Sequence, residues 1–207
     1  MQVESFFLIA VIILSVVIHE VSHGYAANFL GDPTARLAGR LTLNPLKHLD
    51  LLGSVIIPGL LIMFGGFIFG WAKPVPYNPY NLRAGRSGPA IVAAAGPAAN
   101  LFLALLFALM LRFAVPAGLL SPITAGVFGS IAIVNIMLAV FNLLPVPPLD
   151  GSKILFAVLP WRLRFIEDWF QKYQFVFFFF LLFILLNSNF LMRLTYFLFR
   201  LFSGVES

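Results

Sequence analysis

Long apolar runs separated by short polar stretches make up most of this chain of 207 residues. Phe6 to Leu30, Pro89 to Ala114 and Ile123 to Leu144 each reach the length of about 20 residues that a helix needs to cross a bilayer. A fourth run, Phe175 to Leu186, reaches that length only when it is extended backward to Trp169. The pattern predicts an all-α polytopic membrane protein.

The remaining segments do not have the pattern of simple spans. Val55 to Trp71 is at the lower limit of length for a spanning helix, and its Gly65-Gly66 would suit the turn of a re-entrant hairpin, so the pattern alone leaves both options open. Prolines at every second or third position make Lys73 to Leu82 an extended loop or edge strand. The charged segment 151–172 and the short run Phe190 to Phe202 indicate interfacial helices.

We therefore expect a three-helix catalytic core with a re-entrant or extended segment and C-terminal helices, all within one domain, residues 1–207. The extended Lys73 to Leu82 segment would either accept a substrate as an added strand or tie two helices together at the membrane surface. The sequence pattern leaves both roles open.

Composition supports the membrane assignment, because 61% of the residues are hydrophobic, 10% are charged and the mean hydropathy is +0.99. The 13 Lys and Arg residues give a net charge of +5, but they fall in loops, which favours contact with a membrane surface over nucleic-acid binding. No Lys or Arg precedes the first apolar run, so we expect no cleavable signal peptide. Cysteine is absent, and any metal would have to be held by His, Asp or Glu.

The first apolar run contains the sequence His19-Glu20-Val21-Ser22-His23. Residues four apart lie on one face of a helix, so two imidazoles at this spacing can bind one metal ion. Glu20 is placed to accept a proton from a metal-bound water, as in the His-Glu-x-x-His metalloproteases. Ionisable side chains inside a membrane are costly and usually functional, which favours a metal site here over a purely structural cluster.

A catalytic zinc ion usually has three protein ligands and an open position for water. Four residues could supply the third ligand on chemical grounds, namely Asp32, His48, Asp50 and Asp150. Asp150 could equally be the N-cap of a helix that starts in Gly-Ser-Lys-Ile-Leu, since Asp is a favoured residue at that position. The residues alone leave this choice open.

Two motifs together resemble the site-2 protease family of intramembrane zinc metalloproteases. They are His19-Glu20-Val21-Ser22-His23-Gly24 and Asn142-Leu143-Leu144-Pro145-Val146-Pro147-Pro148-Leu149-Asp150-Gly151. The likeness extends to Gly96-Pro97-Ala98-Ala99-Asn100 and to the Asn44-Pro45 to His48 stretch, and the chain is similar to short bacterial members without PDZ or CBS domains.

The resemblance implies a multi-pass protease of the cell membrane, of the bacterial inner-membrane type, that acts on transmembrane proteins or peptides. It implies Zn²⁺ held by His19, His23 and Asp150, with Glu20 as the catalytic acid and base. It makes Asn142 a hydrogen-bond donor to the substrate or to the oxyanion. The resemblance does not give a role for His48, which we expect to be a structural residue or a support for a metal ligand.

Three rival interpretations have different sequence requirements. A membrane metal transporter could use the same His and Asp residues, but it usually needs ionisable relays in several helices, and the other spans offer mainly Asn. An inactive scaffold would be expected to lack Glu20. A different membrane zinc hydrolase, such as a prenyl-protein endopeptidase, is disfavoured by the motif that runs from Asn142 to Gly151.

Topology follows from the requirement that His19, His23 and Asp150 reach one ion. The first and third long helices must then be parallel, so Val55 to Trp71 cannot add a full crossing between them. The basic segments 31–53, 73–88 and 151–172 are expected in the cytoplasm, because 113–122 carries no basic residue. This places the N-terminus outside and the zinc ion nearer the cytoplasmic face.

Overall fold

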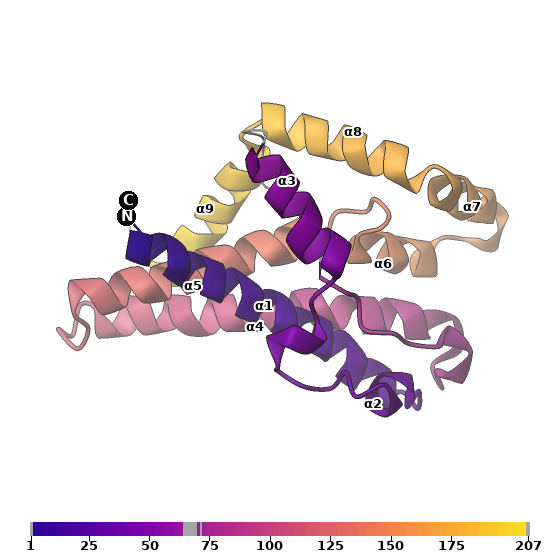
Figure 1. The fold of residues 1–207 in the computed structure, drawn as a ribbon, viewed down its shortest axis with the longest axis horizontal. Helices are drawn as coiled ribbons and strands as arrows, with labels where there is room; N and C mark the ends of the chain where they lie inside the picture. The colour runs from indigo at the N-terminus through magenta and orange to yellow at the C-terminus, as the bar shows by residue number, and fades with distance from the viewer. Residues whose placement is uncertain (1, 64–69, 71, 206–207) are drawn as a thin grey trace.

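Helices form nearly all of the regular structure in a computed structural model that describes residues 2–63, 70 and 72–205. The three longest are α1 (Gln2–Phe29), α4 (Gly88–Ala114) and α5 (Pro122–Asn142), and by length and composition they are the three helices that could each cross a membrane. They pack against one another as the core of the molecule (Figure 1). No strand occurs among the described residues, which confirms the all-α prediction.

The direction of the three helices follows from their contacts. The His23 side chain meets Val92 and the His19 side chain meets Asn100, so α1 and α4 are antiparallel. Phe107 of α4 meets Phe128 of α5, whereas Asn100 meets Asn135, so α4 and α5 are antiparallel too. The helices α1 and α5 are therefore parallel, as the topology argument requires.

The stretch between α1 and α4 begins and returns at the same end of the core. It contains α2 (Thr34–Leu37), the 3₁₀ turn Pro45–Lys47, the π-helical segment Leu51–Ile56 and α3 (Ile57–Met63). The Lys73 N–H donates to the His48 carbonyl over 2.8 Å, which joins the residues before and after this helical excursion. The segment between His48 and Lys73 therefore adds no full crossing of the membrane, as predicted for Val55 to Trp71. The expected turn at Gly65-Gly66 lies outside the described residues.

The region after α3 is extended and irregular until the short 3₁₀ turns Pro79–Asn81 and Gly85–Ser87. Asp32, just after α1, accepts hydrogen bonds from the Asn78 N–H and the Asn81 side chain, over 2.7 and 2.9 Å. The Arg83 N–H also donates to the Leu30 carbonyl over 2.8 Å. These bonds fix the end of α1 to the segment that leads into α4.

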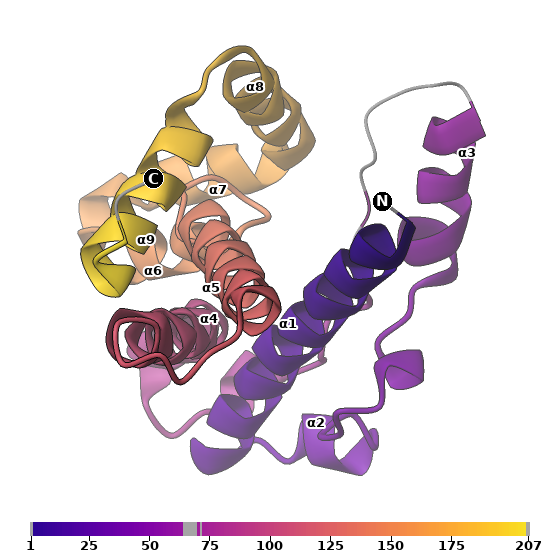
Figure 2. The same cartoon turned by 90° about the vertical axis from the view of Figure 1, so that its left-hand side faces the viewer.

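The C-terminal third consists of α6 (Asp150–Val158), the 3₁₀ turn Trp161–Leu163, α7 (Arg164–Lys172), α8 (Gln174–Asn187) and α9 (Phe190–Ser203). Figure 2 shows α3 and α9 on opposite sides of the three-helix core. One side of α9 packs on Ala104, Ile136 and Val140 of α4 and α5. The short C-terminal helix is thus part of the packed structure as well as part of its surface.

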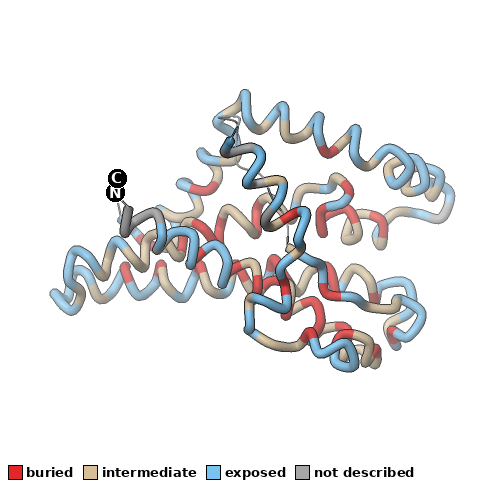
Figure 3. Tube along the Cα trace, in the orientation of Figure 1, coloured by how far each residue is buried: buried red, intermediate tan, exposed pale blue. Residues whose placement is uncertain are grey.

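The predicted backward extension of the fourth apolar run to Trp169 is wrong as a continuous helix, because α7 and α8 meet at a bend of 78°. The break falls at Tyr173, between the charged α7 and the entirely apolar body of α8. Figure 3 shows that most of α8 is exposed or half-buried. Its exposed residues include Phe175, Phe179 and Phe183. Phenylalanines facing outward all along a helix suit a lipid environment.

Candidate metal centre

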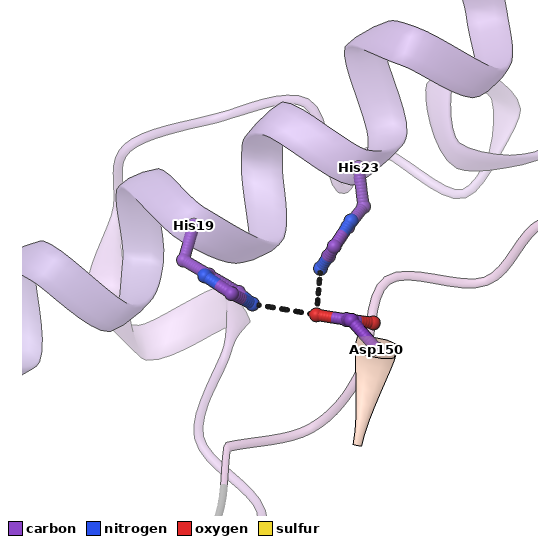
Figure 4. A group of neighbouring side chains, drawn as sticks. All are labelled: His19, His23 and Asp150. Atoms are coloured by element: carbon purple, nitrogen blue, oxygen red, sulfur yellow. Dashed lines mark hydrogen bonds and ion pairs between the residues drawn. The ribbon is translucent and has the colours of Figure 1, made fainter. Parts of the chain in front are cut away.

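His19, His23 and Asp150 lie together although Asp150 is more than 120 residues away along the chain. Oδ2 of Asp150 is 3.1 Å from Nε2 of His19 and 3.1 Å from Nε2 of His23. Figure 4 shows both imidazoles extending from one helix toward that single oxygen. All three side chains are buried, with at most 8% of any residue's surface exposed.

The second nitrogen of each imidazole has an acceptor of its own. His19 Nδ1 is 2.6 Å from Asn100 Oδ1, and His23 Nδ1 is 2.7 Å from the Val92 carbonyl oxygen. A carbonyl oxygen accepts and does not donate, so Nδ1 carries the hydrogen in both rings. In a neutral imidazole the Nε2 atom then has a free lone pair, and both lone pairs point toward Asp150.

The orientation of the Asn100 amide is fixed by a further set of contacts. Its nitrogen donates to the Ser15 carbonyl over 3.3 Å and to Asn135 Oδ1 over 2.8 Å, so its oxygen must face His19. The Asn135 nitrogen donates in turn to Ser15 Oγ over 2.9 Å. Asn100 and Asn135 are fully buried, and this network joins α1, α4 and α5 beside the imidazoles.

This donor set fits a metal ion. With both imidazoles neutral, two nitrogen lone pairs and a carboxylate oxygen converge with no hydrogen between them, an arrangement that a cation stabilises. Ligand atoms about 2.0–2.2 Å from a tetrahedral zinc ion are themselves about 3.3 Å apart, close to the 3.1 Å separations here. The other oxygen of Asp150 lies 3.5 Å from the Lys153 ammonium group, which helps to hold the carboxylate.

Glycine at position 96 gives the imidazoles their space. A Cβ atom at Gly96 would lie 2.5 Å from His23 Nε2 and 2.6 Å from His19 Nε2. Real Cβ atoms do not approach other atoms so closely, and the atoms concerned are the proposed ligands. Any larger residue at this position of α4 would occupy part of the site.

The alternative N-cap role of Asp150 is wrong in this structure. Leu149 is the N-cap of α6, and Asp150 is the first helical residue, with its carboxylate directed to the imidazoles. Gly151 allows this close turn, because a Cβ atom there would collide with the Leu143 carbonyl. The loop between α5 and α6 therefore brings Asp150 back beside α1.

The other three candidate ligands lie outside the cluster. Asp32 binds the residues around Asn78, as described above, and Asp50 caps the π-helical segment by accepting from the Gly53 N–H over 2.7 Å. His48 is 1% exposed, and its Nε2 lies 2.8 Å from the Thr42 carbonyl oxygen. These contacts give each of the three a structural role.

The two predicted catalytic side chains have different surroundings. Oε2 of Glu20 accepts a hydrogen bond from the Val75 N–H over 2.9 Å, so the proline-rich segment lies directly over the His-Glu-x-x-His turn. The Asn142 amide donates to the Leu138 carbonyl of its own helix over 2.9 Å. No described contact joins Asn142 to the three converging ligands.

Comparison with known proteins adds a match to peptidase family M50 over residues 7–185. The chain belongs to peptidase family M50. The predicted membership of the site-2 protease family is therefore confirmed, and with it the assignment to integral membrane peptidases. No solved structure gives a significant match.

Among curated proteins, "Putative zinc metalloprotease YwhC" of Bacillus subtilis (strain 168) is 40% identical over 177 residues, which cover 83% of this chain and 78% of that protein. "Putative zinc metalloprotease Rip2" of Mycolicibacterium smegmatis is 35% identical over 146 residues, or 69% of this chain. "Putative zinc metalloprotease Rip2" of Mycobacterium tuberculosis (strain Erdman) is 32% identical over the same length. The match spans about half of each Rip2 protein, 53% of its length.

Sequence reasoning missed several supports of the site. Val92 contributes a backbone atom, which no side-chain motif can reveal, and Gly96 matters only because a neighbouring helix lies against it. Asn100 and Asn135 gave a usable signal, since polar residues in apolar helices need partners, but their partners could not be identified from spacing alone. Val75 belonged to a segment predicted to bind a substrate strand or to tie two helices together, and its bond to Glu20 was not foreseen.

Proposed function

We propose that this protein is an intramembrane zinc metalloprotease that hydrolyses peptide bonds within or near the transmembrane segments of substrate proteins. The observation that carries the proposal is the convergence of His19, His23 and Asp150 beside Glu20 in the apolar core of an M50 peptidase. The relatives named as zinc metalloproteases support zinc as the metal. Because the cluster lies between membrane-length helices, a transmembrane substrate is the class that fits it.

In this proposal His19, His23 and Asp150 hold the zinc ion and leave one coordination position open. A bound zinc ion supplies a water of lowered pKa and polarises the substrate carbonyl. Glu20 accepts the proton of the attacking water and then donates it to the leaving amine nitrogen. Asn100 and the Val92 carbonyl keep the two imidazoles oriented with Nε2 toward the metal.

Asn142 is proposed to donate a hydrogen bond to the substrate. Its amide nitrogen has two hydrogens, and the bond to the Leu138 carbonyl uses one of them. The second hydrogen would serve a substrate carbonyl close to the α5–α6 loop. This role requires the substrate to approach from the side of α5.

The test uses purified full-length protein in detergent or proteoliposomes, with a single-span peptide as substrate and metal analysis in parallel. Glu20→Gln should retain zinc but lose cleavage by at least about 100-fold, because the general base is gone while the imidazoles remain. Asp150→Ala should lose both zinc and cleavage. Wild-type turnover by Glu20→Gln, or uptake of metal into vesicles without any cleavage by the wild type, would refute the protease assignment.

A further inference from the structure

The proline-rich segment 73–76 is held in place by hydrogen bonds to its backbone. The Lys73 N–H donates to the His48 carbonyl over 2.8 Å. The Arg40 guanidinium donates through one nitrogen to the Lys73 carbonyl over 2.7 Å and to the Pro74 carbonyl over 3.4 Å. Pro74 and Pro76 have no N–H, so Val75 supplies the next available donor along the segment.

That donor is used by Glu20. The Val75 N–H binds Oε2 of the carboxylate over 2.9 Å, and the Val75 side chain is only 6% exposed. The segment lies against α1 at Gly24, where an added Cβ would approach Val75 to 2.9 Å. This bond ties one carboxylate oxygen of Glu20 to the backbone of the segment, so the position of the segment affects the position of the carboxylate.

Arg40 is the residue that holds the segment from the other side. Only 7% of its surface is exposed, so this cation is kept out of solvent to bind two backbone carbonyls. Burying a guanidinium group is costly unless it is hydrogen-bonded, which indicates that its position matters. His48 is buried more deeply, with 1% of its surface exposed, and supplies the carbonyl that accepts from the Lys73 N–H.

We propose that Arg40 is a positioning residue for Glu20, acting through the Lys73–Pro76 segment whose Val75 amide holds the carboxylate. The inference rests on the proposed function of Glu20 as general base. It also limits strand addition by a substrate, because the Lys73 N–H, the Lys73 and Pro74 carbonyls and the Val75 N–H already have partners. A substrate strand would have to displace the present partners of these four groups, or form its hydrogen bonds with residues after Val75.

The first test removes the amide hydrogen of Val75. Val75→Pro deletes the donor, and Val75→Ala is the matched control because it retains the N–H and loses only side-chain volume. We expect kcat to fall by up to about 100-fold in Val75→Pro, with KM and zinc content unchanged, since misplacement of a catalytic group by about 1 Å has effects of that size. Val75→Ala should stay within a few-fold of the wild type. Unchanged kcat in zinc-loaded Val75→Pro would overturn the proposal.

The second test addresses Arg40. Arg40→Ala should lower kcat at unchanged zinc content, and Arg40→Lys should restore part of the loss, because an ammonium group can still donate to the carbonyls. Combining Arg40→Ala with Val75→Pro should add little further loss, since both act through one link. If the losses of kcat in the two single variants add fully in the double variant, Arg40 does not act through the Val75 amide.

The third test does not depend on activity, so it separates failure of this inference from failure of the protease assignment. Hydrogen–deuterium exchange by mass spectrometry can follow the Val75 amide closely, because the prolines on either side contribute no exchanging hydrogen. Exchange should accelerate in Glu20→Ala and in Arg40→Ala. Glu167 is a half-buried residue of α7 that accepts a hydrogen bond from Gln171, far along the chain from Val75, and Glu167→Ala provides the control. Unaltered exchange in Glu20→Ala would exclude the proposed bond even if cleavage itself is never observed.

Discussion

The two imidazoles of the site are oriented by chemically different acceptors. His19 is held by a side chain, Asn100, whereas His23 is held by the backbone carbonyl of Val92. A side-chain partner can be lost by a single substitution, but a backbone partner remains whatever residue is present. Substitutions in the buried amide network should therefore affect His19 before His23.

Gly96 permits a sharp test of space at the site. Gly96→Ala should weaken zinc binding by at least about tenfold, because the new methyl group overlaps both Nε2 atoms. The change cannot act by weakening the helix, since Ala is a better helix former than Gly. Gly126→Ala in α5 is the matched control, as nothing lies within 4 Å of its added Cβ. Zinc titration of both variants is the measurement, and equal affinities would contradict the assigned geometry.

Asp32 provides a pH-dependent prediction outside the membrane spans. Burial alone would raise the pKa of its carboxyl, but hydrogen bonds from Thr34, Asn81 and Asn78 outweigh burial and lower the pKa below the ordinary 3.8. A depressed pKa stabilises the fold above the unfolded-state pKa, and this stabilisation is lost as the pH falls through the lower folded-state value.

Asp32→Asn should therefore be less stable than the wild type at pH 7, by about 1–3 kcal/mol, because charge-assisted bonds are replaced by weaker ones. The difference should shrink as the pH falls below about 4. Thermal unfolding in detergent at a series of pH values measures this difference. A gap between the two proteins that stays constant down to pH 3 would contradict the assigned role.

At the scale of elements, helix packing depends on small residues along α4. Ala104 is fully buried and touches the cluster formed by Ile136, Val140 and the inner face of α9. Lipid tails are as apolar as leucine, so packing of close-fitting surfaces has to supply much of the attraction between such helices. Small side chains let the helices approach closely enough for this packing.

Ala104→Leu should destabilise the protein by about 1–3 kcal/mol, since the added atoms have no space between α4, α5 and α9. Met110→Leu, on the same helix and 43% exposed, should leave stability nearly unchanged. Thermal unfolding in detergent compares the two variants. If both behave alike, the packing of α9 onto α4 and α5 is not what the structure indicates.

The elements were predictable to the extent that length and hydropathy determine them. Three long helices and the extended segment around Val75 could be expected from apolar runs and prolines alone. The bend at Tyr173 could not be predicted in this way. An apolar run shows which residues can lie in lipid, but it does not show where a helix changes direction next to a charged segment. The candidate site was also only partly predictable. The spacing of His19 and His23 could be seen in the sequence, whereas the choice of Asp150 depended on the family resemblance. The contacts of Glu20 could be known only from the fold.

At the scale of the whole molecule, the loops before and after α3 lie at the same end of the three-helix core. The bonds from Lys73 to His48 and from Arg83 to Leu30 hold residues 30–48 and 73–83 together there. The loop between α4 and α5 lies at the opposite end of these helices. This arrangement agrees with the expectation that α1 and α5 are parallel and that the segment between α1 and α4 adds no full crossing.

Single cysteines in this Cys-free chain can test the arrangement in membranes. Cysteines at Ala38 and Ser87 should react with a membrane-impermeant reagent from the cytoplasmic side, and a cysteine at Ser121 from the other side. Inverted and right-side-out vesicles provide the comparison. Labelling of Ala38 and Ser87 from opposite sides would require a full crossing between them and a different route to the metal centre.

The buried positions of α4 recur every fourth residue through Val92, Gly96 and Asn100. In order, they provide an acceptor for His23, space for both rings and an acceptor for His19. These three turns of α4 therefore fit His19 and His23 of α1 in only one alignment of the two helices. A slide of α4 along α1 by a single turn would remove the Asn100 acceptor from His19 and place a larger residue at the rings. The metal centre therefore also fixes the alignment of the two helices.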